Sequence, residues 1–585
     1  MGKMFDFNIA AYLPAGGIKE ASMDDIRRGI EFFKKYCPLD KVYIEPHRGN
    51  TDVSDDKIRA VKAMFEEYGI ETAGGITTTI QIPGHEKNSI FNTFCYSEAA
   101  GRDRLVEIVK NTTKIFDEVI LDDFYFTACR CEKCIEAKGK KSWAEYKLGL
   151  MEEISHLIIR AAKETKPGMK FIIKFPNWYE SYQETGYNPE KQKDMFDGIY
   201  TGTETRNPKY DQQHLQRYMS YSIVRYLENV SPLRNGGGWI DPFGLSDDIS
   251  GYVEQAEFTF FAKARELMLF NFFVLADTSF LPALTPRLSR LNSVIKQCGK
   301  PKGVSLYEPY NADGEDQLVN YLGMTGIPFE PSPIFGGPSF SGPGSGEGQV
   351  VFLPASAAKD AGIMEKLENY VLAGNTAVIT SGFLKECLER GIKDMTSARP
   401  TGKTVAGKEY WIEPYGERRK VSAGSEKILL EAIDYKTNAT WCEIAMMTGF
   451  NSFPLLLHDY YGKGHLFILN APNDFGDLYS LPGEVTGHIN RVFAADSPYV
   501  KSSPRISVFE YDNDVLGIYS HKVFADDVEI VLPGKYSLIR DLETGGEITP
   551  AADSVFRRYP DTKAGAFKTA KVNIPGGGYR FFKLT

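Results

Sequence analysis

Short runs of apolar residues alternate with longer amphipathic segments over the first 300 residues of the chain. The runs have the length and composition of strands buried on both faces, and the segments between them have the spacing of helices. We count eight such runs, at residues 5–12, 41–45, 70–76, 119–122, 170–175, 197–204, 236–241 and 266–274. The intervening helices are expected at residues 22–36, 56–68, 102–116, 143–165 and 246–265. This alternation predicts a (β/α)8 (TIM) barrel over residues 1–300.

The pattern changes after residue 300, where strands and helices become sparser. Strands are expected at residues 303–307, 349–354, 376–382 and 465–470, and helices at 313–322 and 358–373. They predict a flavodoxin-like, doubly wound α/β domain over residues 301–496, with a β insertion near 400–440. Short alternating strands separated by Asp-Asn and Pro-Gly turns then predict a C-terminal antiparallel β-sandwich over residues 497–585.

The composition of the chain excludes several classes of function. The 68 basic and 77 acidic residues give a formal charge of -9, with no basic run interleaved with aromatics, which predicts no nucleic-acid partner. No stretch approaches eighteen apolar residues, so we expect a soluble chain with no membrane span. We expect it in the cytoplasm, or in the periplasm or medium if a signal peptide has been removed. The sequence has no G-x-x-x-x-G-K-[ST] phosphate-binding loop, no H-E-x-x-H zinc motif and no G-x-S-x-G elbow after a strand. We expect no organic cofactor.

Polar residues end most of the apolar runs, and a TIM barrel carries its active site at that end of its strands. They are Glu45, His47, Asp122, Asp123, Lys174, Asn177, Trp178, Glu204, Arg206, Trp239 and Asp241. Two opposed carboxyl groups are the working parts of most glycoside hydrolases, and Asp123, Glu204 and Asp241 are our catalytic candidates. We expect the others to bind an oligosaccharide or glycoside, with Trp178 or Trp239 stacking on a sugar ring.

Simpler roles remain open for these residues. A carboxylate at a strand end can cap a helix or pair with a neighbouring Arg or Lys. His47 fits hydrogen bonding within a loop as well as contact with a substrate.

Three cysteines follow the fourth predicted strand in a C-x-C-x-x-C pattern, as Cys129, Cys131 and Cys134. Cys95 lies upstream and can complete a set of four thiolates. Such a closed tetrahedral set predicts a structural zinc ion, and reduced, partly buried thiols are the alternative. The other four cysteines lie singly and far apart, which is not a disulfide framework.

Residues 95–104, the helix and strand that follow, and the cysteine motif resemble the zinc-bearing β-galactosidases of glycoside hydrolase family 42. Residues 326–329, 461–469 and 477–482 are similar to the middle domain of that family. The resemblance implies a barrel, an α/β domain like a glutamine amidotransferase without its catalytic residues, and a small C-terminal β domain. It also implies a homo-oligomer, a trimer or a dimer.

The resemblance departs at the chemistry. The family ends strand four with Asn-Glu, whose Glu is the acid/base, and has a Glu nucleophile on strand seven; here Asp122-Asp123 and Asp241 occupy these places. An Asp on strand four with a carboxyl group on strand six resembles the retaining α-glycosidase barrels, such as α-galactosidase-like enzymes. That likeness implies Asp123 as nucleophile and Glu204 as acid/base.

We therefore predict a retaining exo-glycosidase acting on an α-linked, galactoside-like sugar. One alternative is a family 42-like β-galactosidase with Asp123 as acid/base and Asp241 as nucleophile. Another is a carbohydrate-binding protein that has lost its catalytic pair.

Overall fold

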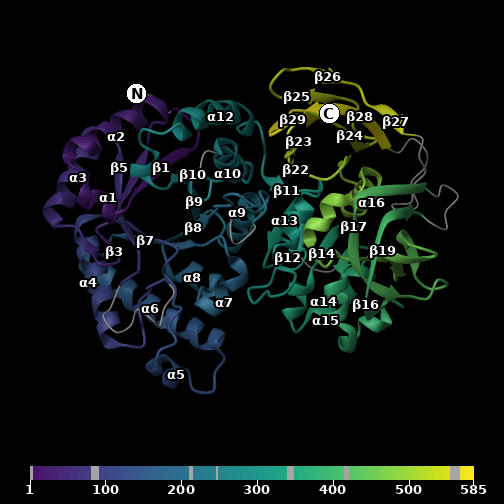
Figure 1. Ribbon diagram of the computed structural model, residues 1–585, viewed down its shortest axis with the longest axis horizontal. Coiled ribbons are helices and arrows are strands. Elements are labelled where there is room, and N and C mark those ends of the chain that lie inside the picture. The colour runs from purple at the N-terminus through teal and green to yellow at the C-terminus, as the bar shows by residue number, and fades with distance from the viewer. Residues whose placement is uncertain are drawn as a thin grey trace. The chain divides into compact units, whose positions relative to one another are not determined.

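The computed structural model describes residues 4–80, 91–209, 215–245, 248–338, 348–413, 420–553 and 567–585. The chain forms two compact units, Met1–Ile295 and Lys296–Thr585 (Figure 1). Among the helices within the described ranges, none has the length and apolar character needed to cross a membrane.

The first unit is built around a closed barrel of eight parallel strands (Figure 1). The strands are β1 (Asn8–Leu13), β2 (Lys41–Ile44), β5 (Glu71–Ile76), β6 (Glu118–Leu121), β7 (Lys170–Phe175), β8 (Gly198–Gly202), β9 (Asn235–Ile240) and β10 (Glu266–Leu269). Each pairs with the next along the chain, and β10 closes the barrel against β1 with Asn8 aligned to Glu266. The predicted TIM barrel is confirmed, and each predicted run overlaps one of these strands.

Helices separate the barrel strands in the chain. They are α1 (Ala15–Glu20), α2 (Met23–Tyr36), α3 (Asp55–Glu67), α4 (Ala99–Ile115), α5 (Glu132–Lys138), α6 (Trp143–Thr165), η1 (Tyr179–Ser181), α7 (Tyr182–Thr185), α8 (Pro189–Met195), α9 (Met219–Val230), α10 (Ile249–Phe261), α11 (Phe272–Leu275) and α12 (Phe280–Ile295). Helix α2 shows why these segments form: Ser22 and Asp25 make a capping box, and Ile26, Ile30 and Phe33 bury one face.

Two expected elements end elsewhere. The eighth apolar run was expected to stay extended to residue 274, but the strand ends at Leu269 and α11 follows. Asn271 causes the change, because its side chain accepts hydrogen bonds from the backbone N–H groups of Phe273 and Val274 and so caps a helix. The helix expected at residues 246–265 spans Ile249–Phe261, and residues 246–247 lie outside the described part of the chain.

Large side chains fill the interior of the barrel. Tyr12, Tyr43, Tyr200, Trp239 and Met268 form one buried cluster there. A barrel filled in this way has no pore, so the polar side chains available for chemistry lie at the strand ends.

The second unit contains a nine-stranded sheet in the order β13-β12-β14-β15-β20-β19-β18-β16-β17. Its parallel strands are β12 (Val304–Tyr307), β13 (Phe329–Ser332), β14 (Val350–Leu353), β15 (Thr376–Thr380) and β20 (Gly464–Leu469). The antiparallel strands are β16 (Arg399–Ile412), β17 (Lys420–Asp434), β18 (Trp441–Thr448) and β19 (Asn451–Tyr461). The polar segment near 400–440 therefore extends the central sheet at one edge.

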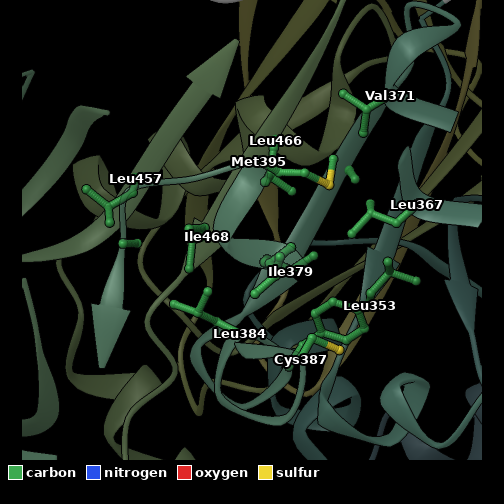
Figure 2. Packing of buried hydrophobic residues seen from close by; sticks show 14 of the residues in the cluster. Leu353, Leu367, Val371, Ile379, Leu384, Cys387, Met395, Leu457, Leu466 and Ile468 are labelled. Atoms are coloured by element: carbon green, nitrogen blue, oxygen red, sulfur yellow. The ribbon is translucent and has the colours of Figure 1, made fainter. Parts of the chain in front are cut away.

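Helices and 3-10 turns accompany this sheet. They are α13 (Leu318–Gly323), η2 (Ala355–Lys359), α14 (Ile363–Leu372), α15 (Ser381–Glu386), η3 (Leu388–Arg390), η4 (Ile392–Asp394), η5 (Phe475–Ser480) and α16 (Gly483–Ala494). The helices expected at 313–322 and 358–373 thus begin later than predicted. Leu367 and Val371 of α14 pack against Leu353, Ile379 and Ile468 of the strands (Figure 2).

Two antiparallel sheets complete the second unit. One contains β11 (Pro301–Lys302), β22 (Ile506–Tyr511), β23 (Val515–Ser520), β29 (Gly578–Leu584), β25 (Ile539–Asp541) and β26 (Glu547–Ile548). The other contains β21 (Tyr499–Lys501), β24 (Asp526–Pro533), β28 (Phe567–Ile574) and β27 (Ala551–Asp553). Side chains from both, including Val508, Ile518, Ile530 and Val572, share one core, as in a sandwich. Strand β11 pairs with β22 of the first of these sheets, although in the chain it follows soon after the end of the barrel unit. The sequence pattern did not indicate this pairing.

Candidate active site

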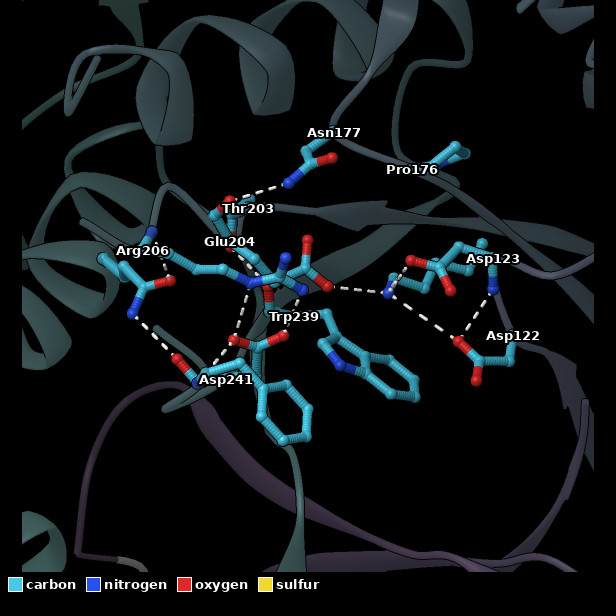
Figure 3. Close-up of polar contacts among 12 residues, drawn as sticks. Asp122, Asp123, Pro176, Asn177, Thr203, Glu204, Arg206, Trp239 and Asp241 are labelled. Carbon is cyan, nitrogen blue, oxygen red and sulfur yellow. Dashed lines mark hydrogen bonds and ion pairs between the residues drawn. The ribbon is translucent and has the colours of Figure 1, made fainter. Parts of the chain in front are cut away.

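Lys174, near the end of β7, lies between the carboxyl groups of Asp123 and Glu204. Figure 3 labels both of these acidic residues. Lys174 Nζ is 2.9 Å from Asp123 Oδ2 and 2.7 Å from Glu204 Oε1, and 3.8 Å from Asp122 Oδ1. The same nitrogen stands 4.1 Å from the centre of the Trp239 ring. The sequence placed Lys174 among substrate-binding residues, and the structure makes it the link between two catalytic candidates.

The barrel brings these residues together because parallel strands end at the same face. Asp122 and Asp123 directly follow β6, and Glu204 follows β8 after Thr203. Thr203 is fixed by hydrogen bonds from its N–H and its hydroxyl to Trp239 O, both at 2.9 Å. Asn177 Nδ2 donates to the backbone oxygen of Glu204 at 2.7 Å, which fixes the segment from the other side.

The three carboxyl groups around Lys174 have different proton affinities. Burial raises the pKa of Asp123 to about 8, with the charges of Asp122 and Glu204 adding to the rise and Lys174 opposing it. Burial also raises the pKa of Glu204. For Asp122 the burial effect is outweighed by Arg48 and Lys174, which lower the pKa to about 2. Acid/base sites commonly place a carboxyl group that stays protonated near neutral pH beside another that is ionised.

The two oxygens of Glu204 differ in their surroundings. Oε1 is bound by Lys174, whereas Oε2 is buried and has no hydrogen-bond partner among the residues that the structure describes. Buried polar atoms are nearly always satisfied, and an unsatisfied one marks a place where a ligand or water binds. The side chain of Glu204 is 3% exposed and that of Asp123 is 23% exposed.

Glu45 is bound on all sides by the protein. It accepts hydrogen bonds from Tyr12 OH at 2.7 Å, from Ala15 N at 2.8 Å and from Arg48 Nε at 2.9 Å. Arg48 Nη2 then donates to Asp122 Oδ2 at 2.8 Å. Glu45 thus orients the arginine that keeps Asp122 ionised. Its partner Tyr12 was missed as a site residue, since a Tyr inside a strand gives no such signal in sequence.

His47 has both ring nitrogens engaged. Nδ1 lies 2.8 Å from Asp52 Oδ1 and Nε2 lies 3.2 Å from Thr79 O. These contacts join the short strands β3 (His47–Arg48) and β4 (Thr51–Asp52) to the segment after β5. They favour the loop-holding alternative for this residue.

The two tryptophans differ in access. Trp239 is 2% exposed within the barrel core, so little of its ring is open to a sugar. Trp178 is partly exposed and packs edge-on against Phe126 and Tyr187, with ring centres 5.3 and 5.5 Å apart. Trp178 therefore remains the better candidate for stacking.

The four predicted cysteines converge. Cys95 Sγ lies 3.7 Å from the sulfurs of both Cys131 and Cys134, which are 3.6 Å apart, and all four sulfurs, with that of Cys129, lie within 4.8 Å of one another. A tetrahedron with metal–sulfur bonds of about 2.3 Å has edges of about 3.8 Å. Disulfide sulfurs would stand about 2.05 Å apart. The buried cluster therefore has the size of a four-coordinate metal site.

A TIM barrel with two carboxyl groups close together at its strand ends has the groups that glycosidase chemistry uses. Residues 1–283, which include all eight barrel strands, match the family described as "Probable glycosyl hydrolase, catalytic domain". An uncharacterized protein of Saccharolobus solfataricus is 25% identical over 368 residues, which are 57% of this chain and 61% of that relative. The chain thus matches about three fifths of the relative's length.

Solved structures of β-galactosidases share the fold. The enzyme from Bacillus circulans sp. alkalophilus has a TM-score of 0.60 and 10% identity, with 100% of both chains covered. That from Rahnella sp. R3 has a TM-score of 0.61 and 10% identity, covering 99% of this chain and 98% of the other. A family 42 enzyme from G. stearothermophilus has a TM-score of 0.58 and 11% identity, covering 100% and 99%. At these identities the likeness establishes the architecture only.

Proposed function

We propose that the protein is a retaining exo-glycosidase in which Asp123 and Glu204 are the catalytic carboxyl groups. The contact of both with Lys174 Nζ, at 2.9 and 2.7 Å, carries the proposal. Asp123 Oδ2 and Glu204 Oε1, the two oxygens that this nitrogen contacts, cannot be further apart than these two distances added together. That limit lies near the separation of about 5–5.5 Å in retaining enzymes and below the 6.5–9.5 Å of inverting ones.

The pKa and the exposure of each group suggest its role. The acid must hold a proton at neutral pH and later activate water, and Asp123, with a pKa of about 8 and 23% exposure, suits this role. The nucleophile needs a free oxygen in a protected place, and Glu204 Oε2 suits that. We therefore keep the catalytic pair predicted from sequence and exchange the two roles.

The reaction follows from these positions. Asp123 gives its proton to the glycosidic oxygen while Glu204 Oε2 attacks the anomeric carbon, so that the bond to the leaving group breaks and a glycosyl ester forms. The Asp123 carboxylate then removes a proton from water, which attacks the ester and releases Glu204. Lys174 stays charged throughout, because its pKa is raised by the surrounding carboxylates, and it offsets the negative charge that moves between the two groups.

The substrate class to test first is the α-linked, galactoside-like sugar predicted from sequence. β-Galactosides come second, because the solved structures with this fold are β-galactosidases. Asp241 as nucleophile is less well supported, since Arg206 binds both of its oxygens. A binding protein without turnover would show sugar binding by calorimetry and no hydrolysis.

A screen of aryl α- and β-glycosides, with NMR of the first-formed anomer, tests the reaction. We expect retention of configuration. A 2-fluoro glycoside followed by peptide mass spectrometry then identifies the nucleophile, and we expect the label on Glu204. A label on Asp123 would restore the roles predicted from sequence, and one on Asp241 would favour the family 42-like alternative. Inversion, or hydrolysis unaffected by Asp123→Asn and Glu204→Gln, would refute the proposal.

We propose also that Cys95, Cys129, Cys131 and Cys134 hold a structural zinc ion. The proposal rests on the sulfur spacing and on the absence of any place for a substrate within a closed set of four thiolates. Association into trimers or dimers, implied by the family resemblance, stays a prediction, and light scattering that shows a monomer would contradict it.

A further inference from the structure

Trp178, Phe126 and Phe91 form a row of aromatic side chains on the catalytic face of the barrel, and Phe124 lies beside Phe126 and Phe91. Trp178 meets Phe126 edge-on with ring centres 5.3 Å apart, Phe126 and Phe124 lie 6.3 Å apart, and Phe91 stands 6.0 and 6.3 Å from these two phenylalanines. The residues come from three segments, which follow β5, β6 and β7. All three segments leave the barrel at the C-terminal ends of its strands.

Two of these aromatic residues are chain neighbours of site residues. Phe124 directly follows Asp123, and Trp178 directly follows Asn177, whose Nδ2 binds the backbone oxygen of Glu204. The rings differ in exposure, since Phe126 is 5% exposed, Phe91 is 53% exposed, and Trp178 and Phe124 lie between these values. Phe91 is therefore the ring of this group that is most open to solvent.

The thiolate cluster ties together the two segments that carry most of the row. Cys95 follows Phe91 on the segment after β5, and Cys129 follows Phe126 on the segment after β6. The four sulfurs lie within 4.8 Å of one another, so the cluster fixes these segments together.

We propose that the row, with Phe91 at its outer end, is the binding site for the leaving group, and that this group is a ring with an apolar face, as in a second sugar. The proposal rests on the proposed function, because Asp123 protonates the leaving-group oxygen and the leaving group must then lie on the side of Asp123. Sugar and aryl rings stack on aromatic side chains through their C–H faces and π systems. Phe91, Phe124 and Trp178 offer ring surface there.

The test compares three substrates that share one glycone: a glycosyl fluoride, a phenyl glycoside and a disaccharide. The fluoride leaving group is too small to reach the row. We expect Phe91→Ala to lower kcat/KM for the phenyl glycoside and the disaccharide by about three- to tenfold, the size expected for loss of one aromatic contact, and to leave the fluoride unchanged. Leu233→Ala is the matched control, because Leu233 is 81% exposed and lies between α9 and β9, at the N-terminal side of the barrel.

The outcomes separate the two proposals. If Phe91→Ala affects all three substrates equally or none, while Asp123→Asn and Glu204→Gln abolish turnover, the leaving-group site is wrong and the catalytic pair stands. If those two variants keep wild-type turnover of the fluoride, the proposed function itself fails. A loss confined to the phenyl glycoside would place an aryl group rather than a sugar on the row. Equal thermal melting of Phe91→Ala and wild type confirms that folding is intact.

Discussion

The guanidinium of Arg206 binds both carboxylate oxygens of Asp241, Nε to Oδ1 at 3.0 Å and Nη2 to Oδ2 at 2.7 Å. Asp241 Oδ1 also accepts a hydrogen bond from Phe243 N at 3.0 Å. Both oxygens of Asp241 therefore already accept hydrogen bonds, and a carboxylate held in this way positions its neighbours. The sequence allowed this pairing with Arg206 but could not distinguish it from a catalytic role for Asp241.

We therefore expect Asp241→Asn to lower kcat/KM by up to about 100-fold, through misplacement of Arg206 and the segment after β8. Glu204→Ala should lower it by about 10⁴-fold or more, because the nucleophile is lost. Initial rates with added azide distinguish the two, since azide should restore turnover of Glu204→Ala as a glycosyl azide. Azide rescue of Asp241→Ala, with none for Glu204→Ala, would make Asp241 the nucleophile.

The pH profile of kcat/KM should show an alkaline limb at about pH 8. Asp123 must be protonated to act, and burial raises its pKa to about 8, so activity falls as the pH rises through that value. In Asp123→Asn, an activated leaving group such as 2,4-dinitrophenolate should still depart, and its profile should lack the alkaline limb. An unchanged limb in that variant would assign the titration to another group.

Stability should also depend on Asp123. Below about pH 4 the carboxyl is protonated in the folded and unfolded chains; between about pH 4 and 8 only the unfolded chain ionises, so the free energy of unfolding falls as the pH rises. Asp123→Asn removes this loss. We expect the variant to be more stable than wild type by ~1–3 kcal/mol at pH 9, less than the full shift gives because water reaches the side chain.

Thermal melting from pH 4 to pH 9 checks this expectation. The difference between variant and wild type should be small at pH 4, grow with pH and level off above about pH 8. A constant difference would show that Asp123 does not carry the raised pKa.

Lys174→Met should remove most activity. The variant keeps a long unbranched side chain and loses the charge that balances Asp123 and Glu204, so we expect kcat to fall by about 10²–10³-fold. The pKa of Asp123 should rise further, since Lys174 opposes the burial effect, and the alkaline limb should move up. Lys174→Arg restores a cation and serves as the control. Wild-type kcat in Lys174→Met would contradict the central place of this lysine.

Purified protein should contain about one zinc ion per chain by metal analysis. Cys134→Ser should lose the metal and melt at a lower temperature, because a closed thiolate site contributes directly to folding. Cys387→Ala is a matched control, since Cys387 is buried away from the cluster in the second unit and should leave the zinc content unchanged. Wild-type melting and zinc content in Cys134→Ser would refute the site.

Much of the architecture follows from sequence alone. The eight barrel strands could be found because a strand buried on both faces is a continuous apolar run, and α2 because Ser22 and Asp25 mark its start. The cysteines were found because thiolate ligands leave a spacing that can be recognised. Periodicity failed at residues 270–274, where an apolar run continues and the cap from Asn271 decides the structure.

The sequence by itself determined the barrel, the ring of polar residues at its strand ends and the candidate pair Asp123 and Glu204. Only the tertiary structure decided that Lys174 lies between them, and that Glu45 and Asp241 are held by Arg48 and Arg206. The reason is physical. The proton affinity of a carboxyl group depends on its burial and on charges a few ångströms away, and here those charges come from strands that lie far apart in the chain.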